Sequence, residues 1–522
     1  MSGRLPMTGV VALVLASLTL AVAGAASARG TDVARTKAEP KQLVIAINQG
    51  GEIYDPTSVL PSTISVVAAN VFDWLMWRTP SGKLVPSVAT AWDLSPDGKT
   101  LSLTLRKNVR FSNGDLLTAT DVVFSWNRLK ANGFSDRIAR TLTSWEVVDP
   151  THLIAHFAAP EIGFIPSGGF PIVDHDYWQR VGEAAFKANP IGSGPYKISK
   201  IAAGQYVDLE RNPSYWGKKG KTAGVRFQTI LDDTTRIASL KTGAADVVMQ
   251  VPYQNVDPVN KTKGLKTVTL VPAGSTVYLA FKAQSGATPW KNPLVRQAVA
   301  LAINRSAIVK KLLKGIPVSY PFLAPTDLGY DFSISHYPFN VAKAKELLTQ
   351  AGYPSGFSTE LPYLNAQTGM SETAQAVALY LAQVGIKVTP KPLTGADFVP
   401  WVFKAAHDPS MDYIAMFLGA VAGKAEPATA LLNSFSSVTP FAWYNNPQAN
   451  GLILRANATV DDAARAALLK QAQNIIHDDY GFVPLWNSAM VYGMKSCIQF
   501  TPQLGDIDLL LLRHLDATRC RG

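Results

Sequence analysis

Residues 101–130 read LSLTLRKNVRFSNGDLLTATDVVFSWNRLK and place three local patterns in one short run. Alternating apolar residues predict a half-buried strand, and Asn113-Gly114-Asp115 predicts a tight turn after it. Thr120 predicts the cap of a helix that follows. The apolar side chains of that helix share one face: Val122, Val123, Trp126 and Leu129. No residue in the run looks catalytic. The run therefore predicts a strand, a turn and a helix, and no active-site residue.

The chain on either side continues with predicted strands, turns and helices. Residues 92–106 read WDLSPDGKTLSLTLR, and Pro96-Asp97-Gly98 between alternating runs predicts a hairpin. Residues 43–48 read LVIAIN and predict a buried strand. Residues 234–249 and 371–390 each contain a helical apolar pattern, a glycine stop and a strand. Such units predict an α/β fold in more than one lobe, with mainly parallel sheets and helices on both faces.

The first residues predict export from the cytoplasm. A lone Arg4 precedes the apolar run 10–23, and Ala26-Ser27-Ala28 supplies small residues before a cut. Residues 1–28 therefore predict a cleaved signal peptide, because the apolar run is too short for a membrane-spanning helix. No cysteine follows the cut that could carry a lipid anchor, so we expect a soluble periplasmic protein.

Cys497 and Cys520 are the two cysteines of the sequence. In the oxidising periplasm we expect them to form a disulfide. The formal net charge is +11, from 49 Lys and Arg against 38 Asp and Glu, but the basic residues are scattered along the chain. This distribution predicts a solvated basic surface and argues against a nucleic-acid partner.

Six segments carry a resemblance to one family, and they occur in the family's order over nearly all of the mature chain. They are residues 82–128, which contain most of the opening run, and residues 189–200, 270–309, 337–354, 384–388 and 468–486. These segments resemble the extracellular solute-binding proteins of the dipeptide/oligopeptide/nickel-binding family (family 5), which serve ABC importers. The resemblance implies a two-lobed periplasmic-binding-protein fold of type II, with an extra subdomain in the first lobe and a two-strand hinge. The opening run is then expected to be scaffold of that subdomain.

The resemblance also divides the chain. We expect the extra subdomain at residues 60–185 and lobe II at residues 276–484. Lobe I is expected to combine residues 29–59, 186–275 and 485–522. The chain should pass into lobe II near residues 275–283 and return near residues 482–494, so that the two crossing strands act as a hinge.

One segment departs from the pattern of the peptide-binding members. Residues 416–432 read MFLGAVAGKAEPATALL, and the resemblance aligns Glu426-Pro427 with an acidic-Pro pair. Ala420 then stands where a tryptophan is usual. Gly423 stands where peptide-binding members place the aspartate that pairs with the α-amine of the ligand. We therefore expect a free peptide N-terminus not to be anchored in this way, with Glu426 as the nearest substitute acid.

Candidate ligand contacts come from both lobes. In residues 441–447, FAWYNNP, an aromatic pair can stack on a ligand while an asparagine supplies a donor and an acceptor. After the first strand, side chains at the carboxyl end of a sheet are where ligands of α/β proteins collect. The candidates are Glu52, Ile53, Tyr54, Trp401, Phe417, Gly423, Trp443, Tyr444, Asn445 and Asn487.

Enzymatic chemistry finds little support in the sequence. The seven histidines show no zinc spacing, and His477-Asp478-Asp479 is better interpreted as a solvated helix end than as a metal site. Gly192-Ser193-Gly194 lacks the glycine that a nucleophile elbow needs. We expect a monomeric binding protein without catalysis, cofactor or metal, docking on an inner-membrane permease with its ATPases. Its ligand is a peptide, or a sugar-like, opine-like or chelate solute; the alternative is an exported hydrolase of peptides or glycans.

Overall fold

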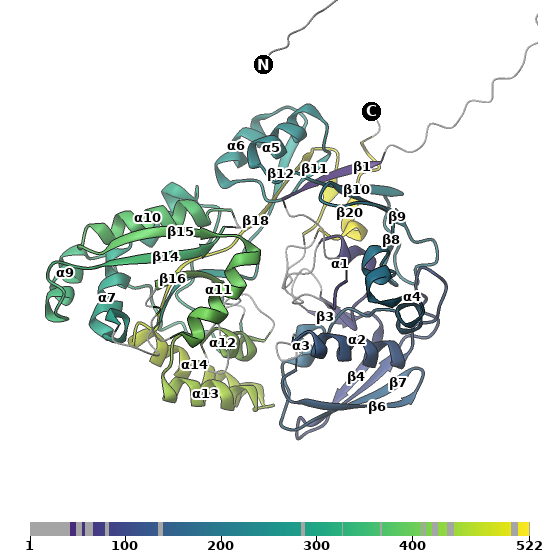
Figure 1. Cartoon of the computed structure of the whole chain (residues 1–522), viewed down its shortest axis with the longest axis horizontal. Helices are drawn as coiled ribbons and strands as arrows, with labels where there is room; N and C mark the ends of the chain where they lie inside the picture. The colour runs from purple at the N-terminus through teal and green to yellow at the C-terminus, as the bar shows by residue number, and fades with distance from the viewer. Residues whose placement is uncertain are drawn as a thin grey trace, which may run out of the picture. The chain divides into compact units, whose positions relative to one another are not determined.

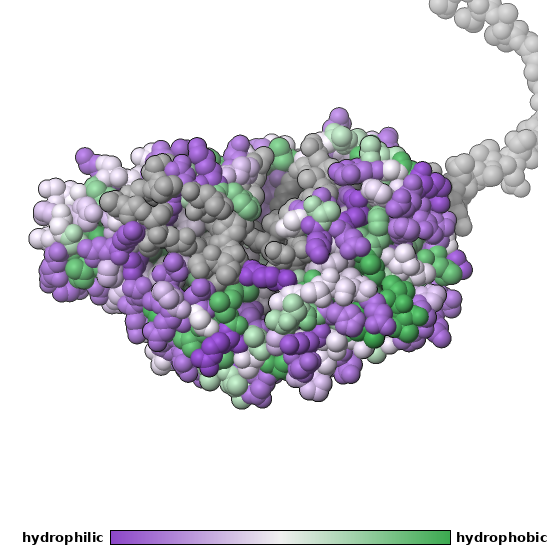
Figure 2. All heavy atoms as spheres, turned by 60° about the horizontal axis from the view of Figure 1, so that its bottom comes forward, coloured by the Kyte–Doolittle hydropathy of each residue, from purple (hydrophilic) through white to green (hydrophobic). Residues whose placement is uncertain are grey.

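The computed structural model covers the chain, and residues 42–522 form a compact unit of their own. The residues that the structure describes are 42–48, 55–57, 66–78, 83–133, 139–282, 288–325, 327–365, 368–408, 411, 414–419, 426–435, 443–502 and 510–520. The predicted signal peptide lies outside them, as do Glu52, Ile53, Tyr54 and Gly423. In the described part, no helix has the length and apolarity that crossing a bilayer requires. On the face drawn in Figure 2, hydrophobic side chains occur in small groups among hydrophilic ones.

A seven-stranded sheet has the predicted strand β1 (Leu43–Ile47) near its centre. It pairs in parallel with β10 (Gly224–Thr229) and β11 (Val247–Val248). The remaining strands add to both sides in the order β12-β18-β11-β1-β10-β9-β8 (Figure 1). Their bounds are β8 Tyr196–Ala202, β9 Tyr206–Arg211, β12 Leu265–Leu270 and β18 Met490–Lys495.

A five-stranded sheet has the order β15-β14-β16-β13-β17. The strands are β13 Thr276–Phe281, β14 Ser358–Leu364, β15 Lys387–Leu393, β16 Ile414–Gly419 and β17 Phe482–Asn487. The helices that belong with it are α7 Pro293–Ala302, α8 Arg305–Ala307, α9 Val341–Gln350, α10 Met370–Ala382, α11 Gly395–His407, α12 Pro427–Phe435, α13 Pro447–Asn457 and α14 Asp462–Asp478. The single-turn elements η4 Pro289–Lys291 and η5 Ile308–Leu312 flank α7 and α8.

Both sheets are mixed, and the expectation of mainly parallel sheets is therefore wrong. Parallel pairing is confined to β1 with its two neighbours and to β14 with its two neighbours. The strands β13 and β17 enter the five-stranded sheet antiparallel to their neighbours, and β12 and β18 do the same in the other sheet. The hairpins of β8, β9 and β10 add further antiparallel pairs.

The helix–glycine–strand units occur where the sequence predicts them. In the first, α5 (Asp233–Thr242) ends at Gly243, whose φ is +78°, and β11 follows. In the second, α10 is followed by Gly385, with a φ of +91°, and by β15. A left-handed backbone at the end of a helix strains any residue with a Cβ, which explains the glycines.

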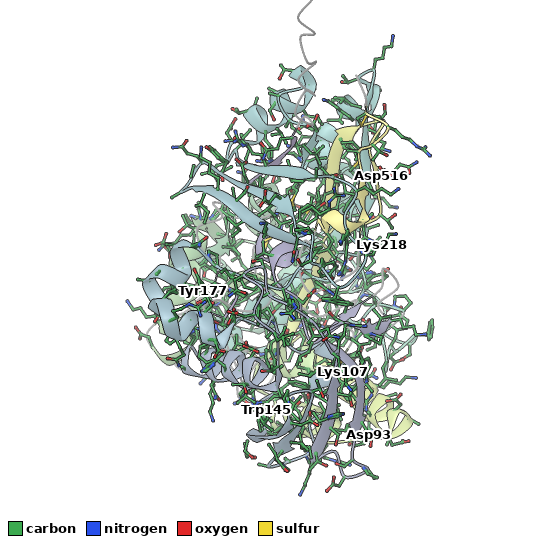
Figure 3. All side chains as sticks on the ribbon, turned by 90° about the vertical axis from the view of Figure 1, so that its right-hand side faces the viewer. Asp93, Lys107, Trp145, Tyr177, Lys218 and Asp516 are labelled. Carbon is green, nitrogen blue, oxygen red and sulfur yellow. A yellow bond between two sulfur atoms is a disulfide. The ribbon has the colours of Figure 1, made fainter. Side chains whose placement is uncertain are left out.

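The opening run builds part of a separate four-stranded antiparallel sheet of order β4-β5-β7-β6. Its strands are β4 Ala89–Leu94, β5 Thr100–Leu105, β6 Leu142–Asp149 and β7 His152–Phe157. Asp93 and Trp145 in Figure 3 mark its two outer strands. The predicted hairpin joins β4 and β5, with Gly98 at a φ of +68°. The elements around this sheet are β2 Met76–Arg78, β3 Leu84–Pro86 and α3 Phe164–Ser167, whereas α1 Ala68–Val71 packs beside β8 in the core of the seven-stranded sheet and α4 His175–Ala188 contacts α2 (Ala119–Ala131).

The predicted helix is α2 (Ala119–Ala131), and its N-cap is Thr118 rather than Thr120. The Asp121 carboxylate accepts hydrogen bonds from the backbone N–H and hydroxyl of Thr118, at 2.7 and 3.1 Å. It also accepts from the backbone N–H of His175 at 2.9 Å, which ties the first turn of α2 to α4. The apolar face is confirmed, since Val122, Trp126 and Leu129 are buried and Val123 is half-buried.

The chain passes between the seven-stranded and the five-stranded sheet twice, once between β12 and β13 and once between β17 and β18. The two connecting segments are hydrogen-bonded to each other: the backbone N–H of Ala273 donates to Ser488, and that of Ser488 donates to Ser275, both at 2.7 Å. Beside them lie η3 (Tyr253–Asn255) and α6 (Val256–Lys261). The two sheets are thus joined by a pair of adjacent backbone segments.

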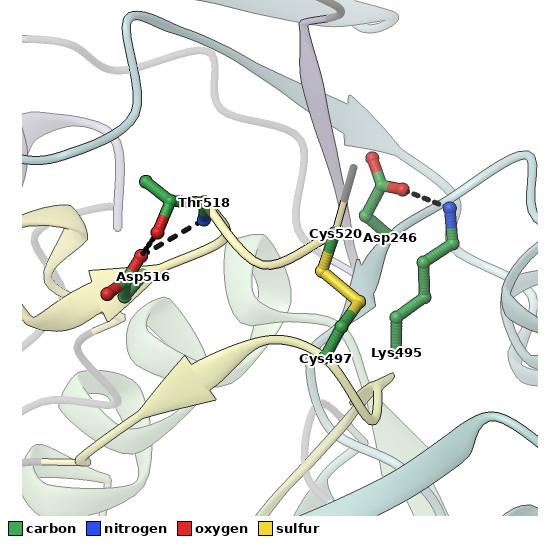
Figure 4. The surroundings of a disulfide bond; sticks show 6 residues. All are labelled: Asp246, Lys495, Cys497, Asp516, Thr518 and Cys520. Atoms are coloured by element: carbon green, nitrogen blue, oxygen red, sulfur yellow. Dashed lines mark hydrogen bonds and ion pairs between the residues drawn. A yellow bond between two sulfur atoms is a disulfide. The ribbon is translucent and has the colours of Figure 1, made fainter. Parts of the chain in front are cut away.

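The C-terminal segment packs back on the seven-stranded sheet through β19 (Gln499–Phe500), η6 (Leu512–His514) and β20 (Leu515–Asp516). The predicted disulfide joins Cys497 and Cys520 (Figure 4). Near it, Lys495 pairs with Asp246 at 2.5 Å, so a charge pair ties the end of β18, two residues before Cys497, to the start of β11.

Asp73 organises a buried polar cluster below this segment. Its carboxylate accepts hydrogen bonds from Trp216 Nε1 at 2.8 Å and from the hydroxyls of Ser193 and Tyr215 at 3.2 Å each. Burial raises the pKa of Asp73 to about 6 from an ordinary value of 3.8, while these hydrogen bonds and the Arg513 charge oppose the rise. The folded chain therefore binds a proton at Asp73 that the unfolded chain has already released between pH 4 and pH 6.

This cluster predicts a measurable pH dependence of stability. Because the folded-state pKa is raised, the contribution of Asp73 is complete below about pH 4 and is lost as the pH rises through about 6. In Asp73→Asn the residue no longer titrates. The free energy of unfolding of the wild type, relative to that of the variant, should therefore fall by about 2–3 kcal/mol between pH 4 and pH 7. Urea unfolding of both proteins at several pH values measures this difference. Parallel pH profiles would contradict it.

Candidate functional site

The carboxyl ends of β10, β1 and β11 meet at one edge of the seven-stranded sheet, because the three strands are parallel neighbours. Arg236 of α5 is fully buried behind this edge. Its guanidinium donates to the carbonyl oxygens of Ile230 and Leu231 after β10 and of Met249 and Gln250 after β11, at 2.9–3.2 Å. It also pairs with Asp233. One cation therefore fixes the backbone at two strand ends.

Two amide side chains follow the strands at this edge. Asn48 comes directly after β1, and its Nδ2 donates to Oε1 of Gln250 at 2.5 Å. Gln250 has a φ of +53°, in the left-handed region that residues with a Cβ seldom adopt. Neither residue was predicted from the sequence. Asn48 had a signal in its place after a buried strand, whereas nothing in the local pattern marks Gln250.

On the five-stranded sheet, three of the predicted residues come together. Trp443 packs edge-on against Phe417 of β16, with ring centroids 5.1 Å apart, and lies 5.4 Å from Trp401 of α11. Phe417 and Trp443 are 3% and 2% exposed, and Trp401 is half-buried. The buried indole Nε1 of Trp443 has no hydrogen-bond partner within the described residues. These aromatic side chains form part of the core beside β16.

Tyr444 and Asn445, the next two residues, have other surroundings. The Tyr444 ring covers Gly481, where a Cβ would come within 2.6 Å of it. Tyr444 is buried, and burial raises the pKa of its hydroxyl above the ordinary value of 10, with the Asp479 charge adding to the rise. Asn445 is exposed. The predicted aromatic pair thus consists of two rings with different neighbours.

Asn487 ends β17 at the second change of sheet and is fully buried. Its Nδ2 donates to the Thr276 hydroxyl, its Oδ1 accepts from the backbone N–H of Tyr320, and its own N–H donates to Val318, at 2.7–2.8 Å. These bonds join the two crossing strands to the neighbouring loop. Asn487 therefore carries structural hydrogen bonds in this conformation.

Glu426, the substitute acid of the sequence analysis, stands at the start of α12. Its carboxylate accepts from the backbone N–H of Ala428 at 3.1 Å and lies 3.6 Å from Arg465 Nε. Both side chains of this pair are buried. These contacts give Glu426 a structural role at the start of α12. Gly423 lies outside the described residues.

The remaining motifs take structural roles. Gly192 and Gly194 pass so close to the Val71 carbonyl oxygen that a Cβ would lie 2.1 and 2.6 Å from it. Ser193 between them donates to Asp73. His477 stacks on Tyr337, with ring centroids 4.5 Å apart. Over the described ranges, no group of three or more His, Cys, Asp or Glu side chains could hold a metal ion.

Comparison with known proteins identifies the family. The family described as bacterial extracellular solute-binding proteins, family 5, matches residues 83–442. The chain belongs to this family. Among its relatives, the glutathione-binding protein GsiB of Escherichia coli O1:K1 is 27% identical over 466 residues, which cover 85% of this chain and 88% of the relative. Family 5 proteins bind solutes for ABC importers, so the match supports solute binding over the exported hydrolase.

Solved structures place the family 5 protein in the two-lobed periplasmic-binding-protein fold. The binding protein DppA from Helicobacter pylori, in complex with the peptide STSA, has a TM-score of 0.77 and 26% identity, covering 91% of this chain and 97% of its own. NikA from Brucella suis, in complex with Fe(III)-EDTA, has a TM-score of 0.77 at 21% identity, covering 91% and 99%. At this identity, the similarity to NikA shows only that the two proteins share a fold. The predicted α/β two-lobed fold is thereby confirmed.

Proposed function

We propose that this family 5 protein is exported to the periplasm, captures a small peptide-like solute between its lobes and delivers it to an inner-membrane ABC permease. The observation that carries the proposal is the family match over residues 83–442, together with a glutathione-binding relative along 85% of the chain. We further propose that the protein acts as a monomer and docks transiently in its closed form.

For the lobes we propose the division of the chain that the sequence predicts. Lobe I combines residues 29–59, 186–275 and 485–522, the extra subdomain covers residues 60–185, and lobe II covers residues 276–484. The paired segments around Ala273 and Ser488 support a hinge, since a bend at two adjacent connections leaves the core of each sheet intact. A solute between the lobes is then desolvated from both sides.

The proposed ligand-binding residues are the ten candidates predicted from the sequence. The strongest of them are those that follow a strand. Glu52, Ile53 and Tyr54 follow β1, and Gly423 follows β16. Trp401, Phe417 and Trp443 are proposed to form the apolar wall behind the solute rather than its stacking surface, because their rings pack on one another. Asn445 is the exposed member of its segment.

Binding without turnover is the expected result. Glutathione, the peptide Ser-Thr-Ser-Ala, the dipeptide Met-Leu and Fe(III)-EDTA are each added to the purified protein, and the melting temperature is measured. A solute at one hundred times its dissociation constant stabilises the folded state by about 2.7 kcal/mol. We expect a peptide-like solute to do so, and Met-Leu and N-acetyl-Met-Leu to bind equally weakly, because Gly423 offers no carboxylate for an α-amine.

Two outcomes would count against this proposal. A solute recovered chemically altered at catalytic rates would favour the hydrolase. Tight binding of Met-Leu that N-acetylation abolishes would show that another acid anchors the N-terminus, and the pairing of Glu426 with Arg465 makes Glu426 a poor candidate for that role.

A further inference from the structure

The Asn48–Gln250 amide pair lies where a ligand of the seven-stranded sheet is expected. The two residues follow β1 and β11, whose parallel register sets Ile45 opposite Val247 and Ala46 opposite Val248. The backbone N–H of Met249 continues this pairing and donates to Ala46 at 3.0 Å. Both amides therefore stand at the carboxyl edge of the sheet, the side on which open α/β sheets bind their ligands.

The backbone at Gln250 is held in a conformation that costs free energy. A left-handed φ of +53° is unfavourable by about 1 kcal/mol or more for a residue with a Cβ. Arg236 stabilises it by donating to the carbonyl oxygens of both Met249 and Gln250. On the other side, the backbone N–H of Val251 donates to Val491 of β18 at 2.9 Å. Backbone strain that the surroundings maintain in this way is concentrated at functional sites.

Among the described residues, the pair leaves one C=O group and one NH₂ group without a hydrogen-bond partner. The bond between Asn48 Nδ2 and Gln250 Oε1 occupies one polar atom of each amide. Asn48 Oδ1 and Gln250 Nε2 remain. Neither is one of the completely buried side-chain atoms that lack a hydrogen-bond partner in the described residues. Exchanging oxygen and nitrogen in both amides gives the same result, a free C=O beside a free NH₂. The pair is also uncharged, so it matches a neutral group better than a carboxylate or an ammonium.

We propose that Asn48 and Gln250 form a ligand-binding subsite that receives an amide group of the solute. The amide C=O of the solute accepts from Gln250, and its N–H donates to Asn48. Arg236 is the positioning residue of this subsite, acting through the backbone of Gln250. The inference rests on the proposed function and narrows its substrate class to solutes with a peptide bond or a comparable carboxamide.

The test uses glutathione, which contains two amide bonds, and repeats the measurement with Ser-Thr-Ser-Ala. Gln250→Glu keeps an acceptor for Asn48 and the size of the side chain, and removes the outward NH₂. The control is Gln228→Glu on β10, which adds the same charge to the same sheet where the native amide donates to the Gln205 carbonyl at 3.0 Å. Gln250→Asn tolerates the left-handed backbone and withdraws the amide by one methylene.

Titration calorimetry should give a dissociation constant at least tenfold weaker for both Gln250 variants and one within twofold of the wild type for Gln228→Glu. The melting temperature without solute checks that each variant folds, and Gln250→Asn decides the outcome if Gln250→Glu does not fold. If the wild type binds a probe and both Gln250 variants bind it equally well, the subsite is wrong while the proposed function stands. If the wild type binds neither probe, the peptide-like solute and the subsite are both wrong.

Discussion

Replacing Arg236 with methionine should lower the free energy of unfolding by about 3–5 kcal/mol, because the Arg236 side chain is fully buried and hydrogen-bonded. The variant keeps the apolar stem but leaves four carbonyl oxygens at the ends of β10 and β11 without their donor. Removing the charged partner from a buried, hydrogen-bonded arrangement typically costs this much. Equilibrium urea unfolding at constant pH measures the change in the free energy of unfolding.

The matched control is Arg226→Met on β10 of the same sheet. Arg226 forms two 2.8 Å hydrogen bonds with Asp208, and its side chain is 31% exposed. A partly exposed pair of this kind contributes about 1 kcal/mol or less. The structural role given to Arg236 is contradicted if Arg236→Met lowers the free energy of unfolding no more than Arg226→Met does.

Removing the disulfide should also have a large effect. The bond between Cys497 and Cys520 spans a sequence separation of 23 residues. Loop-closure entropy for that length predicts a loss of about 3.4 kcal/mol in the double variant Cys497→Ser/Cys520→Ser. The loss should appear in urea unfolding of the oxidised wild type against the double variant.

Reduction provides the control for this prediction. A reductant should lower the stability of the wild type towards that of the double variant and leave the double variant unchanged. Mapping of non-reduced peptides should recover both cysteines in one linked species. Two free thiols in freshly purified, non-reduced protein would contradict the pairing.

Local patterns predicted the elements well because their causes are local. The hairpin at Gly98 and the helix ends at Gly243 and Gly385 need backbone conformations that favour glycine, and the sequence shows those glycines. The cap of α2 was misplaced by two residues, although the signal was present. Asp121 stands three residues after Thr118, the spacing at which an acidic side chain reaches back to the N-cap.

Sheet pairing and the candidate site depend on contacts between distant residues, which periodicity does not reveal. The antiparallel pairs come from the crossings between the two sheets and from the hairpins of β8, β9 and β10, so the mixed sheets could not be derived from single helix–strand units. Trp443 and Tyr444 are neighbours in a segment without regular structure, and their side chains pack against different elements. Gln250 is marked only by its backbone conformation and by Arg236 behind it.

The most direct test of solute binding without turnover is native mass spectrometry of the protein purified from the cells that make it, followed by denaturation and identification of the released molecule. We expect one small solute per chain, carrying an amide group and recovered unaltered when added back to fresh protein. A solute that is converted to product on repeated exposure to the protein would contradict it.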